Sequence, residues 1–240
     1  MAPTMGDFAE TSPALGDLDG DGLDDLVLGD SGGRLVYYRN VGSASDTKYE
    51  EAAENPFDEL GTFTYSAPVL VDLNGDSDLD VVMGGATGIH YFENTGNAQT
   101  PAYSDRTGGA DDPFTGLDVD GRSSPAFGDL DGDGDLDLVV GIQEISESMR
   151  DNGVSSTVIY FENIGSANQT AYVQRIGYGL NPFYGISRKS CKPQLVDLDN
   201  DGDLDMVYGG DESIVELYLN VGSKYVWTYM AVTGSNSPLS

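Results

Sequence analysis

The sequence predicts an all-β fold, a β-propeller built of four four-stranded blades of about 60 residues each. Three observations predict it. A segment that begins with proline and runs into an Asp-rich loop recurs along the chain, starting at Pro13, Pro68, Pro125 and Pro193. Each copy is followed by the same series of short apolar strands, and no segment has the pattern of a long amphipathic helix. We therefore expect one repeat domain, residues 1–240, with blades at about 1–56, 57–113, 114–182 and 183–240.

Each blade is expected to contain four strands. The first leads into the Asp-rich loop, as at 67–71. The second leaves it as a continuous apolar run, which suits a strand covered on both faces, at 26–28, 81–83, 138–140 and 206–208. The third is apolar and aromatic and ends in Asn-x-Gly, at 35–40, 89–94, 158–163 and 215–220. The fourth contains the tyrosine after that turn: Tyr49, Tyr103, Tyr172 and Tyr225.

The third repeat carries an insertion between its second and third strands, at about 143–155. Insertions of this kind are usually tolerated as surface loops. We expect a surface loop here, with a loop that contacts a partner as the alternative.

The Asp-rich loop has the form D-x-[DN]-x-D-x-x-x-D, which places oxygen ligands at alternating positions. Positions are counted from its first Asp. Positions 1, 3, 5 and 9 supply side-chain oxygens, position 7 supplies a backbone carbonyl, and glycine at position 6 permits the sharp turn. Hard cations such as Ca²⁺ are held by oxygens of this kind. The predicted metal ligands, repeat by repeat, are Asp17, Asp19, Asp21, Leu23 and Asp25; Asp72, Asn74, Asp76, Asp78 and Asp80; Asp129, Asp131, Asp133, Asp135 and Asp137; and Asp197, Asp199, Asp201, Asp203 and Asp205.

Calcium is the predicted ion, with up to four ions in the chain. Zinc is disfavoured because no Cys or His lies in any loop, and Mg²⁺ is the second choice because it prefers strict octahedral geometry with retained waters. The loop is not an EF-hand, since its position 12 is an apolar or aromatic strand residue rather than a bidentate glutamate. The alternative, Asp/Gly turns without an ion, leaves several carboxylates to repel one another.

The second repeat departs from this pattern. Asn74 replaces a carboxylate at position 3, and Ser77 replaces the turn glycine at position 6. We therefore predict that the repeat-two site is the weakest of the four.

Composition excludes several classes of function. The chain has 11 Lys+Arg against 41 Asp+Glu, a net charge of −30, so we expect neither nucleic-acid binding nor direct insertion into a membrane. Cys191 is the only cysteine and cannot form an intrachain disulfide. His90 is the only histidine, so no Ser-His-Asp or Cys-His set can be assembled. Paired acids leave glycosidase chemistry open, but the clustered Asp are accounted for as metal ligands, and we expect no catalytic residues, no other cofactor and no enzyme.

At residues 127–141, the segment FGDLDGDGDLDLVVG resembles an FG-GAP/VCBS repeat, the blade unit of integrin α-subunit propellers and of many secreted or surface proteins. The resemblance extends over essentially the whole chain. It implies a β-propeller with Ca²⁺ held between the first two strands of each blade. The Gly-Ala-Pro that ends the integrin version is absent, which counts against an integrin-type function. Because propellers of the family commonly have more blades, an arc or part of a larger propeller and an assembly of chains are alternatives to the favoured set of four blades.

Three functions are consistent with these observations. The first is an extracellular module for binding, adhesion or structural assembly, in which calcium rigidifies the Asp-rich loops. The second is a carbohydrate-binding lectin with exposed tyrosines and Trp227 as stacking groups, and the third is an accessory propeller of a polysaccharide-degrading enzyme. The expected partner is an extracellular protein or glycan, or other copies of the chain. The resemblance implies a secreted or cell-surface protein, although the first residues of this numbering have no features of a signal peptide.

Overall fold

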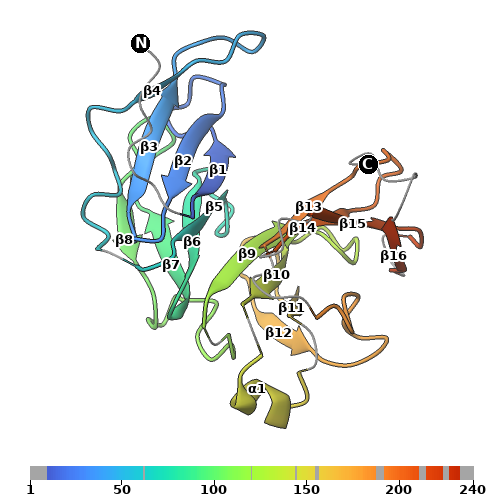
Figure 1. Cartoon of the computed structure of the whole chain (residues 1–240). Helices are drawn as coiled ribbons and strands as arrows, with labels where there is room; N and C mark the ends of the chain where they lie inside the picture. The colour runs from blue at the N-terminus through green and yellow to red at the C-terminus, as the bar shows by residue number, and fades with distance from the viewer. Residues whose placement is uncertain are drawn as a thin grey trace. The chain divides into compact units, whose positions relative to one another are not determined.

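The computed structural model describes residues 10–61, 63–119, 121–143, 145–154, 157–187, 192–210, 215–223 and 227–232. These residues form four four-stranded antiparallel sheets and one short helix (Figure 1). Within each sheet, strands that follow one another in the chain lie side by side, which is the up-and-down order of a propeller blade. The predicted all-β fold with four propeller blades is confirmed.

The strands have the following bounds. The first blade contains β1 (Ser12–Gly16), β2 (Asp25–Gly29), β3 (Leu35–Asn40) and β4 (Tyr49–Glu51). The second contains β5 (Ala67–Val71), β6 (Asp80–Gly85), β7 (Gly88–Asn94) and β8 (Tyr103–Asp105). The third contains β9 (Ser123–Gly128), β10 (Asp137–Ile142), β11 (Val158–Asn163) and β12 (Tyr172–Arg175). The fourth contains β13 (Lys192–Val196), β14 (Asp205–Gly209), β15 (Val215–Asn220) and β16 (Tyr229–Val232).

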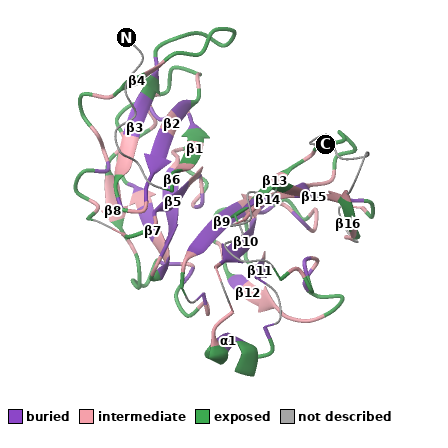
Figure 2. Ribbon diagram, in the orientation of Figure 1, coloured by how far each residue is buried: buried purple, intermediate pink, exposed green. Residues whose placement is uncertain are grey.

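The chain divides into two compact units, Met1–Thr115 and Gly116–Ser240, with two blades in each. In the first unit β1 lies beside β5, and in the second β9 lies beside β13. The second strands of the blades carry the most buried runs. Every residue of β6 and of β10 is buried, as their continuous apolar sequences predict (Figure 2).

Each unit has a core between its two blades. In the first unit Val27 and Tyr37 of one blade pack with Val81, Met83 and Phe92 of the next. The corresponding cluster of the second unit combines residues of both its blades: Val139, Val158, Tyr160, Met206 and Tyr208. The blades of a unit are therefore joined by apolar packing, independently of any ion.

Glycine just before the Asp-rich loop allows the two blades to approach closely. A Cβ atom at Gly16 would lie 2.7 Å from Cδ1 of Leu79, and one at Gly128 would lie 2.5 Å from Cδ1 of Leu204. Both leucines occupy position 8 of the loop in the following blade. No larger residue fits at Gly16 or Gly128 unless these leucines move.

One sequence prediction about the fourth strands is wrong. Asn220 pairs with Tyr229, as Asn40 pairs with Tyr49 in the first blade, so Tyr229 is the fourth-strand tyrosine of the last blade. Tyr225 was predicted in this place and lies outside the described residues. The error arose because Tyr225 is the first tyrosine after the turn, whereas the separation from Asn to Tyr is the same in all four blades.

Part of the insertion in the third blade forms a short helix, α1 (Glu147–Asp151). The side chain of Ser146 caps it by accepting a hydrogen bond from the N–H of Met149. The Met149 side chain is fully buried, so the insertion is anchored by packing and is not only an exposed loop. No helix among the described residues is both long enough and apolar enough to cross a membrane.

Candidate metal centres

The four Asp-rich loops share one hydrogen-bonded turn. In each loop the carboxylate at position 1 accepts hydrogen bonds from the N–H groups of positions 4 and 6, at 2.6–3.2 Å. The side chain at position 5 accepts from the N–H of position 7, at 2.9–3.1 Å. Asp and Asn side chains favour turns of this kind, in which they accept from nearby backbone groups. The backbone turn of each loop is thus stabilised by hydrogen bonds to side chains of the same loop.

The turn requires a left-handed backbone at position 6. Its φ angle is 85° at Gly22, 98° at Gly134 and 93° at Gly202. Ser77 has a φ of 73° at the same place in repeat two. A residue with a Cβ atom is strained in this region, by about 1–2 kcal/mol relative to its preferred conformations. Repeat two therefore keeps the loop conformation at an energetic cost.

Carboxylates converge in three of the four loops. In each of three groups, one carboxylate oxygen per residue can be chosen so that all three lie within 4.8 Å of one another. The groups are Asp17, Asp19 and Asp25; Asp129, Asp131 and Asp133; and Asp197, Asp199 and Asp205. Among the described residues, repeat two has no equally close group of three carboxylates, and its position 3 is Asn74. The spacing of oxygens in the three groups suits a shared cation.

The position-9 aspartates, predicted as metal ligands, also have a structural role that the sequence pattern did not reveal. In all four loops this side chain is almost completely buried and accepts hydrogen bonds through both of its oxygens. One oxygen of Asp137 accepts from the N–H of Leu130 at 3.1 Å and the hydroxyl of Tyr160 at 3.0 Å, and the other accepts from the N–H of Asn163 at 2.8 Å. The same bonds recur at Asp25 and Asp80, and those from the two N–H groups recur at Asp205. Position 9 therefore ties the loop to the third strand.

Two further motifs of the repeat converge on the loop. The asparagine that ends each third strand donates its N–H to position 9, and its side-chain oxygen accepts from two N–H groups of the following turn. The fourth-strand tyrosine donates its hydroxyl to the carbonyl of position 8, at 2.7–3.4 Å. The Asn and Tyr that recur in all four repeats therefore connect the Asp-rich loop to the third and fourth strands by hydrogen bonds. Their constant placement in the sequence was the signal that could have revealed this.

Burial and crowding shift the acidity of the loop carboxylates. Burial, the largest effect, raises the pKa of Asp137 to about 7 and that of Asp80 to about 6, against the lowering effect of their hydrogen bonds. Burial and the neighbouring charge of Asp133 raise the pKa of Asp135 to about 6. Negative charge on Asp80, Asp135 and Asp137 is therefore unfavourable unless a cation compensates for it.

A family model described as "FG-GAP-like repeat" matches residues 17–83 and 72–140, which together make up just over half of the chain. The chain belongs to the FG-GAP-like repeat family. The matched residues include the loops of repeats one, two and three. The loop of repeat four lies outside them, yet it forms the same FG-GAP-like turn.

Among solved structures, an Agrocybe aegerita lectin described as recognising non-reducing terminal N-acetylglucosamine is similar to this FG-GAP-like chain. The two are 18% identical with a TM-score of 0.47, and the match covers 92% of this chain and 52% of that one. The chain thus spans about half the length of that lectin.

The donor set of the FG-GAP-like loops fits a hard divalent cation. All the predicted ligands lie in the four described loops, and every ligand other than Leu23 is an aspartate or asparagine. One oxygen of Asp135, Oδ1, is buried and has no hydrogen-bond partner. A buried carboxylate oxygen without a donor is costly, and a cation would satisfy it. The residues present therefore fit calcium.

Within the described part of the chain, loop one is the FG-GAP-like loop whose predicted ligands include a carboxylate paired with an arginine. The guanidinium of Arg39, on β3, forms an ion pair with the carboxylate of Asp19 at position 3. Glu93 and Glu162 occupy the aligned places in repeats two and three, where they pair with Arg106 and Arg175 instead. Arg39 therefore neutralises part of the negative charge of loop one.

Proposed function

We propose that this chain is a calcium-binding propeller module of the extracellular space, with a role in binding, adhesion or structural assembly and no catalytic activity. The observation that carries the proposal is the convergence of three carboxylates within 4.8 Å in each of three loops. Such groups repel one another in the absence of a cation. The net charge of −30 adds to the attraction for divalent cations at every loop.

The ion would be held by the side chains at positions 1, 3 and 5 and the carbonyl of position 7, with position 9 also available in repeats one and four. Calcium supplies positive charge and accepts several oxygen ligands at once. The chain's own contribution is a turn that is already formed by hydrogen bonds to position 1. Little ordering is then required on binding, because the ligands are held near one another before the ion arrives.

The repeat-two site is proposed to be the weakest. Asn74 supplies a neutral oxygen where the other loops supply a charged one, and Ser77 holds a strained backbone. Affinity for calcium follows the number of charged ligands and the rigidity of the site. In a calcium titration followed by calorimetry, repeat two should fill last. An Asp72→Asn variant that loses the tightest site would contradict this order.

The test of calcium binding compares the full chain in calcium, in magnesium and in excess chelator. Because an ion bound only by the folded state stabilises it, the melting temperature should be highest in calcium and lowest in chelator. Isothermal titration of the chelator-treated chain should show saturable binding of calcium. Equal melting temperatures in calcium and chelator, with no heat of binding, would overturn the proposal. Asp131→Asn with Asp133→Asn should remove one of the sites.

A carbohydrate ligand is the second candidate, and a cavity of about 410 Å³ in the second unit supports it. Three tyrosines are among its lining residues: Tyr184, Tyr218 and Tyr229. Tyr184 is exposed and packs edge-to-face with Tyr178, whose side chain is 92% exposed. Exposed aromatic rings beside a concave surface offer the apolar faces on which sugar rings can pack. A glycan array with wild type and Tyr184→Ala tests it, and binding unaffected by the substitution would exclude this cavity.

A further inference from the structure

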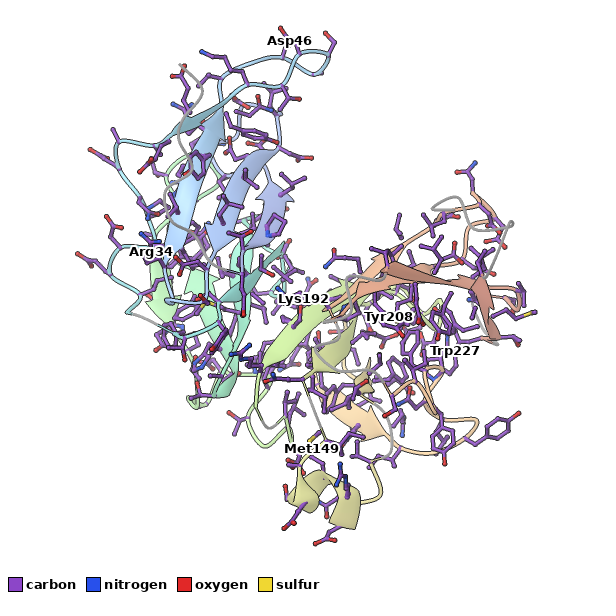
Figure 3. The ribbon with its side chains drawn as sticks, viewed as in Figure 1. Arg34, Asp46, Met149, Lys192, Tyr208 and Trp227 are labelled. Atoms are coloured by element: carbon purple, nitrogen blue, oxygen red, sulfur yellow. The ribbon has the colours of Figure 1, made fainter. Side chains whose placement is uncertain are left out.

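Trp227 belongs to the fourth blade but contacts the Asp-rich loop of the third. It is the only tryptophan in the chain and lies just before β16. Its indole N–H donates a hydrogen bond to the carbonyl oxygen of Leu130, at position 2 of loop three. Its ring packs edge-to-face against Tyr160 of β11, with centroids 5.6 Å apart (Figure 3 labels Trp227). Both blades lie in the same compact unit.

Both contacts lead to the same carboxylate oxygen. Leu130 lies between the predicted ligands Asp129 and Asp131, and its N–H donates to Oδ2 of Asp137. The hydroxyl of Tyr160 donates to that oxygen too, at 3.0 Å. Trp227 therefore touches the two residues that position this buried carboxylate. A movement of Leu130 or Tyr160 would therefore change the surroundings of the indole.

We propose that Trp227 is a positioning residue that couples ion binding in loop three to the docking of blade four on blade three. This inference rests on the proposed calcium binding. The indole restrains the backbone between positions 1 and 3, so the loop holds its ligands more closely when blade four is docked. Linkage requires the reverse effect as well, so that calcium in loop three strengthens the docking of blade four.

The first unit contains a comparable contact without the tryptophan. The side chain of Gln99, in the turn before β8, lies so close to Gly20 of loop one that a Cβ atom there would be 2.4 Å from its amide nitrogen. In both units, a residue shortly before the fourth strand of one blade, Gln99 or Trp227, thus contacts the Asp-rich loop of the preceding blade. Only loop three has an indole N–H bonded to it within the described residues. Loop one therefore serves as the matched control for loop three in the experiments that follow.

The first experiment uses the fluorescence of Trp227 in the full chain. Starting from chelator, added calcium should change the emission of the wild type. The pair Asp131→Asn/Asp133→Asn, in loop three, should abolish this change, whereas the matched pair Asp19→Asn/Asp21→Asn, in loop one, should leave it intact. Binding measured by calorimetry without any change in emission would overturn the inference alone, as would equal loss of the signal in both variants. Absence of binding in calorimetry would overturn the calcium proposal itself.

The second experiment tests the reciprocal effect on affinity. Trp227→Phe keeps a ring against Tyr160 but removes the N–H donor. The net energy of one hydrogen bond, equivalent to about a fivefold change in affinity, sets the upper limit of the effect, so calcium should bind loop three more weakly, by up to about fivefold. The comparison is made in a background in which loops one and four no longer bind calcium, so that their heats do not add to that of loop three in calorimetry. This background carries Asp19→Asn, Asp21→Asn, Asp199→Asn and Asp201→Asn. Tyr229→Phe is the control, because its hydroxyl donates to the carbonyl of Leu204 in loop four. An unchanged affinity in Trp227→Phe, or equal weakening in the control, would contradict the coupling.

Discussion

The position-9 aspartates are predicted to stabilise the fold even without calcium, and repeat four offers the clearest test. Asp205 is completely buried and accepts hydrogen bonds from the N–H of Leu198 at 2.8 Å and the N–H of Asn220 at 2.7 Å. Asp199, at position 3 of the same loop, is exposed. Both belong to the same group of converging carboxylates. Substituting each by alanine separates the role in the fold from the role as a ligand.

The expected magnitude follows from the two donors. Asp205→Ala leaves the buried N–H of Asn220 and the partly buried N–H of Leu198 without their acceptor, and loss of a hydrogen bond to a charged group costs about 1.5–3 kcal/mol. The free energy of unfolding in chelator should therefore fall by about 4 kcal/mol. Asp199→Ala should not change it, because no buried donor loses its partner. In calcium, Asp199→Ala should lose much of the stabilisation that the ion provides, which is about 2.7 kcal/mol for an ion at 100 times its Kd.

Urea denaturation followed by Trp227 fluorescence reports on the unit that contains Asp205. With a slope of about 2–3 kcal/mol per molar urea, Asp205→Ala should lower the midpoint in chelator by more than about 1 M. Leu217 stands where the other repeats have a tyrosine, so Asp205 has one donor fewer than Asp137. Asp137→Ala is not the matched test. Burial raises the pKa of Asp137, so this substitution also removes an unfavourable buried charge, and that gain in stability opposes the loss of the hydrogen bonds. A midpoint for Asp205→Ala in chelator no lower than that of Asp199→Ala would refute the reasoning.

Three further predictions address other residues. Ser77→Gly should raise the free energy of unfolding by about 1 kcal/mol in urea denaturation, because glycine adopts the positive φ without strain, and a loss of stability would contradict this. Arg39→Leu should tighten calcium binding by loop one about two- to fivefold in calorimetry, since it removes a cation paired with Asp19; weaker binding would show that Arg39 supports the site. In chelator, lowering the pH from 8 to 6 should raise the melting temperature, because the pKa of Asp137, raised to about 7, lets the folded chain bind a proton that the unfolded chain, with a pKa near 4, does not. A melting temperature that falls with acidification in chelator would contradict the last prediction.

The predictable part of this protein is the part that depends on local sequence. Asp, Asn and Gly at fixed spacing determine the turn of each loop, and the apolar runs determine strands such as β6 and β10. These signals repeat four times, so the structure of a copy that departs from the pattern, such as repeat two, could be predicted by aligning it with the other three. The wrong assignment of Tyr225 arose where one copy was read by itself.

The parts that could not be predicted depend on contacts between distant residues. The hydrogen bonds from Asn163 and Tyr160 to Asp137 join residues that lie on different strands. The burial of Met149 depends on how the inserted helix packs. Trp227 was predicted as an exposed group for stacking on sugars, but its ring lies against Tyr160 and its N–H is bonded to the backbone of another blade. Periodicity and residue type do not determine such contacts.

The loops combine two opposing interactions, and their balance explains how an ion can act on this fold. The hydrogen bonds to positions 1 and 9 form a closed turn attached to the third strand, and they require no ion. The same turn brings carboxylates together and buries Oδ1 of Asp135 without a partner, which is unfavourable until positive charge arrives. The fold therefore holds the ligands in place against their mutual repulsion. In the proposed function, calcium would relieve a repulsion that already exists in a formed loop, so its binding would stabilise the blades of repeats one, three and four without having to create them.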